Sequence, residues 1–185
     1  MNIHGPVALL MALALAACQS TGSGKDGYFS NPVGVGTELE VVEPLHVPAS
    51  LARVYLQGGE VGRYTDIDQY QPFCYFLMHQ TSPVAQEIRP AVFRVRSVEL
   101  REQDVRLATP LRVVHLGAFG GSDGPGVIAF ETHMVLEVTD QADPERLVCS
   151  GAFAPPAEAA PIRLAEMRLV LGKKVTVRAP GSAGF

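Results

Sequence analysis

Residues 127–138 read VIAFETHMVLEV, and this stretch decides the fold class. Apolar side chains recur at every second position, which is the period of a β-strand with one buried face. That face would carry Ile128, Phe130, Met134, Leu136 and Val138. The opposite face would carry Glu131, His133 and Glu137. We therefore predict a long antiparallel strand whose polar face is exposed to solvent.

Shorter strand candidates occur on both sides of this stretch, separated by glycine and proline. They are residues 39–42, 52–57, 74–78, 91–100, 146–153 and 175–177. Within residues 91–100 the alternation changes face at Ser97-Val98, which indicates a β-bulge. Short alternating strands with Gly and Pro between them are typical of sandwiches and barrels. We predict an antiparallel β-sandwich or a barrel-like domain.

One short helix is expected near the C-terminus. Pro161 suits a first helical position, and Ile162, Ala165 and Leu169 fall on one stripe at helical spacing. Leu164, Met167 and Leu171 adjoin that stripe. Gly172 follows the stripe and can end the helix in a left-handed conformation. The predicted fold class is therefore mainly β, with one short C-terminal helix.

The segment before residue 19 has a different character. Residues 7–17 form an unbroken apolar run, about half of the roughly 20 residues that a membrane-spanning helix needs. The run ends in small residues at Cys18, and polar, glycine-rich residues 19–27 follow. This arrangement is typical of a secretory signal and its cleavage site. A buried N-terminal helix is the alternative, and the polar, flexible chain that follows disfavours it.

Leu15-Ala16-Ala17-Cys18 resembles the lipobox of bacterial lipoproteins. The resemblance implies cleavage before Cys18 and acyl chains on that cysteine. With Gln19 next, it also implies sorting to the outer membrane, on the side that faces the periplasm. Because a single acyl chain holds a protein only marginally, the two or three chains of that class would be needed for a stable anchor. The resemblance thus implies that the chain lies in the cell envelope, with the membrane as its partner through the lipid.

The order of motifs in the rest of the chain resembles a group of uncharacterised Gram-negative lipoproteins. The matching segments are residues 53–59, 70–74, 93–95 and a late strand that contains Cys149. That resemblance implies no activity. The predicted organisation is a signal peptide in residues 1–17, a lipidated cysteine with a flexible tether in 18–36, a β-rich domain in 37–178 and a tail in 179–185.

Charge disfavours one class of partner. The formal net charge is −4, and no run of lysine and arginine is longer than Lys173-Lys174. A nucleic-acid-binding domain would be expected to carry a basic face. We therefore expect no nucleic-acid partner.

Two cysteines remain once Cys18 is assigned to the lipid, namely Cys74 and Cys149. An exported domain meets an oxidising environment, in which disulfides form and persist. We predict a disulfide between them, which would contribute about 4 kcal/mol on a chain-entropy estimate. The alternative is two separate buried thiols.

Two motifs could suggest chemistry. Residues 120–124 read GGSDG, a G-x-S-x-G pattern around Ser122. In hydrolases a helix follows that serine, whereas a proline and the predicted long strand follow it here. Glu131 and His133 could supply two metal ligands from one strand face, but metal sites usually need more converging donors. We predict no catalytic residue, no metal site and no cofactor.

Aromatic side chains crowd around Cys74. They are Tyr64, Tyr70, Phe73, Tyr75 and Phe76. They either pack around the disulfide at one end of the core or form a wall for a ligand or a partner peptide. The candidate binding surface comprises Tyr64, Tyr70 and Phe73, together with Phe119, an aromatic residue set among glycines.

These features predict a membrane-anchored envelope lipoprotein with a non-catalytic binding or structural β-domain. Its partner would be an envelope protein or a small apolar ligand held between sheets. The alternative is a hydrolase, or a small apolar-ligand carrier of the periplasm. A binding domain should present either an apolar cavity or an exposed apolar patch.

Overall fold

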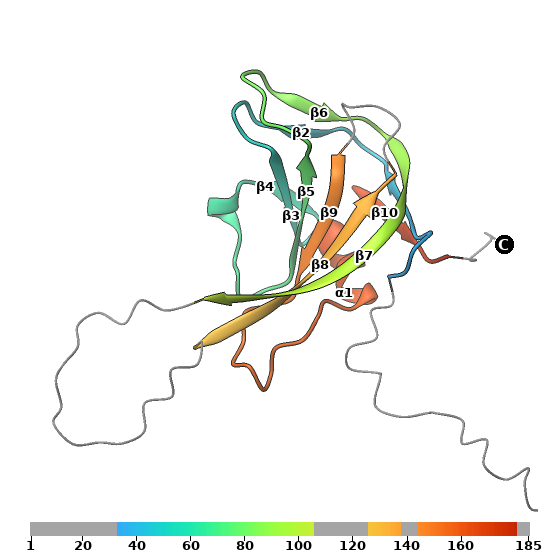
Figure 1. Ribbon diagram of the computed structural model, residues 1–185. Helices are drawn as coiled ribbons and strands as arrows, with labels where there is room; N and C mark the ends of the chain where they lie inside the picture. The colour runs from blue at the N-terminus through green and yellow to red at the C-terminus, as the bar shows by residue number, and fades with distance from the viewer. Residues whose placement is uncertain (1–32, 106–125, 138–143, 181–185) are drawn as a thin grey trace, which may run out of the picture. The chain divides into compact units, whose positions relative to one another are not determined.

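The computed structural model describes residues 33–105, 126–137 and 144–180. These residues form an eight-stranded antiparallel sheet in the order β10-β1-β7-β8-β9-β5-β3-β4, with a separate hairpin of β2 and β6 (Figure 1). The elements are β1 (Glu38–Val41), β2 (Leu45–Val47), β3 (Arg53–Gln57), β4 (Glu60–Gly62), the 3-10 helix η1 (Tyr64–Asp66), β5 (Phe73–Met78), β6 (Gln86–Ile88), β7 (Ala91–Val105), β8 (Val127–Leu136), β9 (Pro144–Ser150), α1 (Leu164–Leu171) and β10 (Val175–Arg178). The predicted fold class is confirmed in its barrel-like form, because the sheet is curled into a half-barrel.

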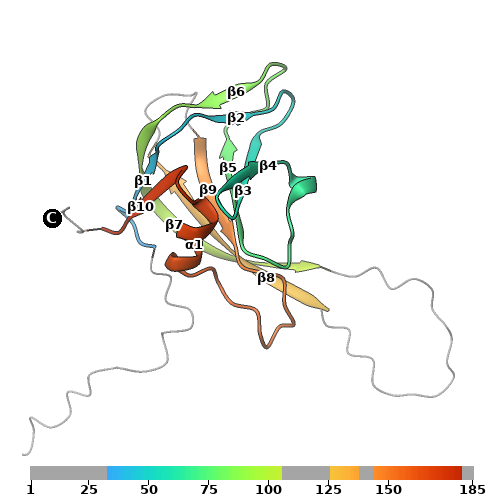
Figure 2. The same ribbon diagram turned by 180° about the vertical axis from the view of Figure 1, so that it is seen from behind.

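The curl follows from a bulge in β7, the longest strand described. The first part of β7 pairs with β1, and the part from Val95 onward pairs with β8. The register of the β7–β8 pair shifts between Val95 and Ser97, where the change of face in the sequence predicts a bulge. Since a bulge bends its strand and increases the local twist, β7 carries the sheet around the curl that Figures 1 and 2 both show.

Helix α1 packs within this curl and contacts β10, β3 and β5 (Figure 2). Strand β10 is one edge of the sheet, and β3 lies next to the other edge. The helix therefore fills the opening of the half-barrel, with Met167 and Leu171 fully buried. Its apolar face and the inner face of the sheet form the main core.

The predicted helix was wrong in its start and in the burial of Leu169, whereas Met167 and Leu171, predicted beside the apolar stripe, are buried. The helix begins at Leu164 instead of Pro161, because Pro161 forms an isolated bridge to Phe130 of β8. The backbone N–H of Arg163 donates to the Glu166 carboxylate at 2.8 Å and closes the first turn. The buried residues are Met167, Val170 and Leu171, whereas Leu169, placed on the core stripe by the sequence, is 74% exposed.

The polar face predicted for the strand in residues 127–138 is covered at His133 and Glu131, contrary to the prediction, whereas Glu137, just after β8, is exposed as predicted. The side chains of His133 and Glu131 are only 8% and 16% exposed. His133 lies opposite Val148 of β9, and Val148 lies opposite Tyr75 of β5. These neighbouring strands supply apolar and aromatic side chains to the same face, so a second, smaller core covers the polar pair. That core consists of Tyr55, Phe73, Tyr75 and Val148.

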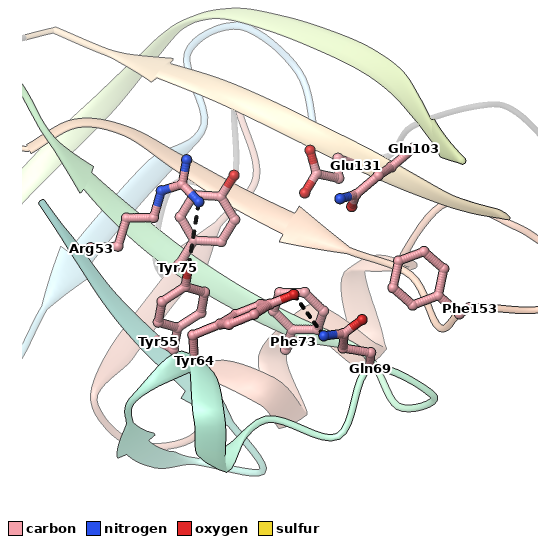
Figure 3. Close-up of a pocket in the computed structure, with 9 residues that line it drawn as sticks. All are labelled: Arg53, Tyr55, Tyr64, Gln69, Phe73, Tyr75, Gln103, Glu131 and Phe153. Atoms are coloured by element: carbon pink, nitrogen blue, oxygen red, sulfur yellow. Dashed lines mark hydrogen bonds between the residues drawn. The ribbon is translucent and has the colours of Figure 1, made fainter. Parts of the chain in front are cut away.

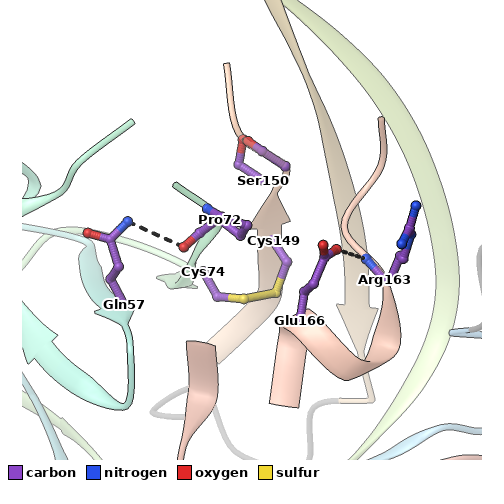
Figure 4. Close-up of a disulfide and its surroundings, with 8 residues drawn as sticks. Gln57, Pro72, Cys74, Cys149, Ser150, Arg163 and Glu166 are labelled. Carbon is purple, nitrogen blue, oxygen red and sulfur yellow. Dashed lines mark hydrogen bonds between the residues drawn. A yellow bond between two sulfur atoms is a disulfide. The ribbon is translucent and has the colours of Figure 1, made fainter. Parts of the chain in front are cut away.

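The predicted disulfide is confirmed. Cys74 and Cys149 lie directly opposite each other on β5 and β9 and are bonded, with their Cα atoms 4.0 Å apart (Figure 4). Both are fully buried on the side of the main core. The bond therefore joins two central strands of the sheet.

The folded unit starts before the predicted boundary at residue 37. Val33 is buried in the main core, and the Gly36 N–H donates to the Val95 carbonyl at 2.8 Å. Residues 33–36 thus belong to the folded unit, although the prediction assigned them to the tether. The predicted signal peptide, Cys18, Phe119 and Ser122 lie outside the described residues. Among those described, no helix has the length and apolar character that a membrane span requires.

Candidate functional site

A hollow of about 140 Å³ opens on the outer face of the sheet, on the side of the smaller core (Figure 3). Five of its lining residues are aromatic and four are polar. They are Tyr55, Tyr64, Phe73, Tyr75 and Phe153, with Arg53, Gln69, Gln103 and Glu131. The hollow thus combines aromatic walls with polar groups that make up most of its accessible lining.

Strand register brings the residues of this hollow together. Tyr55 of β3 lies opposite Tyr75 of β5. Two positions away along β5, Phe73 lies opposite Ser150 of β9, and Glu131 of β8 lies opposite the same Ser150. Because paired residues point to the same face of a sheet, four strands contribute to one surface. Chain segments far apart in sequence therefore build the floor of the hollow.

The aromatic rings pack against one another and hold the wall in place. The Tyr55 ring centroid lies 5.2 Å from that of Tyr75, 5.5 Å from that of Tyr64 and 6.3 Å from that of Phe73, all with tilted ring planes. These are separations at which aromatic pairs attract. The Gln69 side chain donates to the Tyr64 hydroxyl at 2.6 Å, which ties the loop after η1 to the rim (Figure 3).

Arg53 stands at one side of the hollow. Its guanidinium carbon lies 4.9 Å from the centroid of the Tyr75 ring, within cation–π range. Its Nη1 donates a long hydrogen bond of 3.5 Å to the Tyr55 hydroxyl. That hydrogen bond is the main reason why the pKa of Arg53 is raised above its usual value. The guanidinium is therefore a fixed positive charge held against the aromatic wall.

Glu131 supplies the opposite charge from β8. One of its carboxylate oxygens, Oε2, lies 3.0 Å from Nε2 of His133. The other ring nitrogen, Nδ1 of His133, is buried and has no hydrogen-bond partner among the described residues. The histidine thus engages one carboxylate oxygen, and Oε1 remains for a group that enters the hollow.

Tyr75 contributes a hydroxyl that stays protonated. Burial and, to a smaller extent, the negative charge of Glu131 raise the pKa of Tyr75 to about 12. Within the described part of the chain, neither this hydroxyl nor the Gln103 amide has a hydrogen-bond partner. Both are therefore free to bond to a ligand.

The structure brings together two of the four residues of the predicted binding surface. Tyr64 and Phe73 line the hollow. Tyr70 lies outside it with 63% of its surface exposed, and Phe119 is outside the described residues. The polar members Arg53 and Glu131 were missed as binding residues, although each lies on an alternating strand pattern that shows which side chains share its face.

A second hollow, of about 410 Å³, lies between α1 and the start of the β5 segment. Its lining residues are Gln57, Gly58, Gln71, Pro72, Glu166, Leu169 and Val170. Gln57 is tied to the segment before β5, since its side-chain amide donates to the Asp68 carbonyl at 2.8 Å and to the Pro72 carbonyl at 3.3 Å (Figure 4). This hollow is shallow and mostly apolar, and it has no charge pair comparable to Arg53 and Glu131.

Among the described residues, no three His, Cys, Asp or Glu side chains converge. Glu131 and His133 lie close together, as the sequence suggested, but no third such side chain joins them. Comparison with protein-family models, with curated proteins and with solved structures found no match.

Proposed function

We propose that this chain is an envelope lipoprotein whose β-domain is a non-catalytic binding module. The observation that carries the proposal is the hollow beside Tyr55 and Tyr75, where aromatic walls surround polar atoms without partners of their own. A pocket that combines such groups with rigid aromatic walls is suited to hold a ligand or a side chain of a partner.

The location of the module rests on two features of the sequence and structure. The Leu15-Ala16-Ala17-Cys18 segment resembles a lipobox, and lipid on Cys18 would hold the domain at a membrane. The Cys74–Cys149 disulfide is typical of oxidising compartments such as the periplasm. Both features favour the envelope over the reducing interior of the cell.

Site-specific photo-crosslinking in intact cells tests this proposal. A photoreactive residue at Gln103, on the lining of the hollow, should form a discrete adduct that mass spectrometry can identify. The matched control is the same residue at Glu87, an exposed position on β6 away from the hollow. Adducts at Gln103 alone support a binding module. Equal labelling at both positions, or none at either, contradicts it.

A small apolar ligand is the second candidate, and the hollow beside α1 favours it. Its volume of about 410 Å³ lies within the roughly 300–1,000 Å³ of common ligand sites. Leu169 lines it and is 74% exposed. A Leu169→Gln variant should weaken binding of a fluorescent apolar probe if this hollow is used, and leave it unchanged if it is not.

A further inference from the structure

We infer that the hollow on the outer face of the sheet binds a small zwitterion, an α-amino acid with an apolar side chain. Arg53 would take the carboxylate, Glu131 the ammonium group, and the aromatic rings the side chain. This inference rests on the proposed binding function and names its ligand class.

The charges of the lining carry the argument. Arg53 and Glu131 both line the hollow, yet no ion pair joins them, although both are described. Glu131 instead pairs with His133, and Arg53 lies over Tyr75. Two opposite charges that share one pocket without touching leave room for a group between them.

Each charge is held in place by its own neighbours. The Arg53 guanidinium is bonded to the Tyr55 hydroxyl and stacked at 4.9 Å from the Tyr75 ring. The Glu131 carboxylate is held by His133 at 3.0 Å. Binding groups whose orientation is set before the ligand arrives lose less entropy on binding. The His133 imidazole is thus a positioning residue for Glu131.

The charge pair discriminates between classes of ligand. A cation would be attracted by Glu131 and repelled by Arg53. An anion would be attracted by Arg53 and repelled by Glu131. A neutral ligand would desolvate both charges without supplying a counter-charge to either, which is unfavourable. A zwitterion satisfies both at once, because it carries an amine and a carboxylate on the same carbon.

Size and the remaining polar atoms agree with this ligand class. The hollow of about 140 Å³ is smaller than the roughly 300–1,000 Å³ of sites for drug-sized molecules, so it suits a single compact residue. The protonated Tyr75 hydroxyl can donate to the ligand carboxylate. The Gln103 amide can accept from the ammonium group.

Isothermal titration calorimetry with L-leucine and two deletion analogues tests the assignment. Isocaproate lacks the amine of leucine, and isoamylamine lacks its carboxylate. We expect leucine to bind and each analogue to bind about 10- to 100-fold more weakly, as the loss of a hydrogen bond between charged groups predicts. L-Phenylalanine is a second zwitterionic probe. Its larger side chain would contact the aromatic walls if the side chain of leucine is too small to reach them.

Two variants assign each charge to its half of the ligand. Arg53→Gln should remove the preference for leucine over isoamylamine, and Glu131→Gln should remove the preference for leucine over isocaproate. Such a double-mutant cycle isolates each contact from general effects on the fold. The matched control is Arg94→Gln, which removes an arginine paired with Glu38 on another part of the sheet and should leave all affinities unchanged. Thermal unfolding of each variant checks that it is folded.

Three results would overturn the inference. They are binding of neither amino acid, equal binding of leucine and both analogues, and binding of the neutral sugar methyl glucoside in place of leucine. None of them contradicts the binding module itself, because an adduct at Gln103 in cells would still report an occupant of the hollow. Absence of that adduct together with absence of amino-acid binding would remove both proposals.

Discussion

The backbones of Gly59 and Gly172 are in contact where the turn between β3 and β4 meets the end of α1. A Cβ atom on Gly172 would lie 2.5 Å from the Cα atom of Gly59, and both residues have positive φ angles, of 86° and 58°. The Gly59 N–H donates to the Val170 carbonyl at 2.9 Å beside this contact. The two glycines thus let the helix approach the sheet at the edge that carries β3.

A Gly172→Ala substitution should destabilise the domain by about 2–4 kcal/mol, from a disfavoured φ and from steric overlap. Chemical denaturation followed by circular dichroism measures the change. The matched control is Gly58→Ala, whose φ is also positive, at 61°, but whose Cβ atom would meet nothing within 4 Å. This variant should lose only the stability that the disfavoured φ angle costs, about 1–2 kcal/mol. Equal losses in the two variants would show that the Gly59 contact has no energetic role.

Removal of the disulfide should destabilise the fold strongly. The bond links residues 75 positions apart, and loss of a native disulfide typically costs about 2–5 kcal/mol. We expect a reductant to lower the denaturation midpoint of the native protein and to leave a Cys74→Ala/Cys149→Ala variant unaffected, since that variant has no bond to reduce. Mass spectrometry of the native protein under non-reducing conditions checks the bond directly. Two free thiols, at Cys74 and Cys149, would contradict it.

The stability of the domain should fall at alkaline pH because of Tyr75. Burial raises the pKa of this residue to about 12, whereas its ordinary value is 10.0. Between these two values the unfolded chain releases the phenolic proton and the folded chain keeps it. Stability from this source is therefore complete below pH 10 and decreases as the pH rises toward 12.

Ultraviolet absorbance of tyrosinate measures this titration, and the absence of tryptophan from the chain keeps the signal clean. We expect one late-titrating tyrosine in the folded protein, and Tyr75→Phe should remove that step. The control Tyr70→Phe changes a tyrosine that lies outside the hollow and should leave the late step in place. If the late titration step is still present in the Tyr75→Phe variant, the step belongs to another tyrosine and the prediction is wrong.

The lipid anchor makes a separate prediction. If Cys18 carries acyl chains, a Cys18→Ala variant should lose all incorporation of a radioactive fatty acid and leave the membrane fraction or remain unprocessed. A Cys74→Ala/Cys149→Ala variant should keep the label, since it retains Cys18 and changes only cysteines of the folded domain. Persistent labelling of the Cys18→Ala variant would refute the anchor.

Much of the fold was determined by local patterns in the sequence. The alternation in residues 127–138 predicts the strand that becomes β8, the change of face at Ser97 predicts the bulge of β7, and Gly172 predicts the end of α1. These features follow from backbone geometry within a few residues, so no knowledge of distant segments is needed. The pairing of Cys74 with Cys149 followed from the number of cysteines.

Only the tertiary structure decided which segments cover the faces of each element. The helix turned Val170 inward and left Leu169 exposed, because the opening between β10 and β3 sets its rotation. Glu131 and His133 are covered because β9 and β5 place Val148 and Tyr75 beside them. The hollow depends on the same pairing across four strands, whose register is a property of the whole curled sheet and of no single segment. For that reason the sequence alone indicated Tyr64 and Phe73 but not the charges of Arg53 and Glu131 that face them.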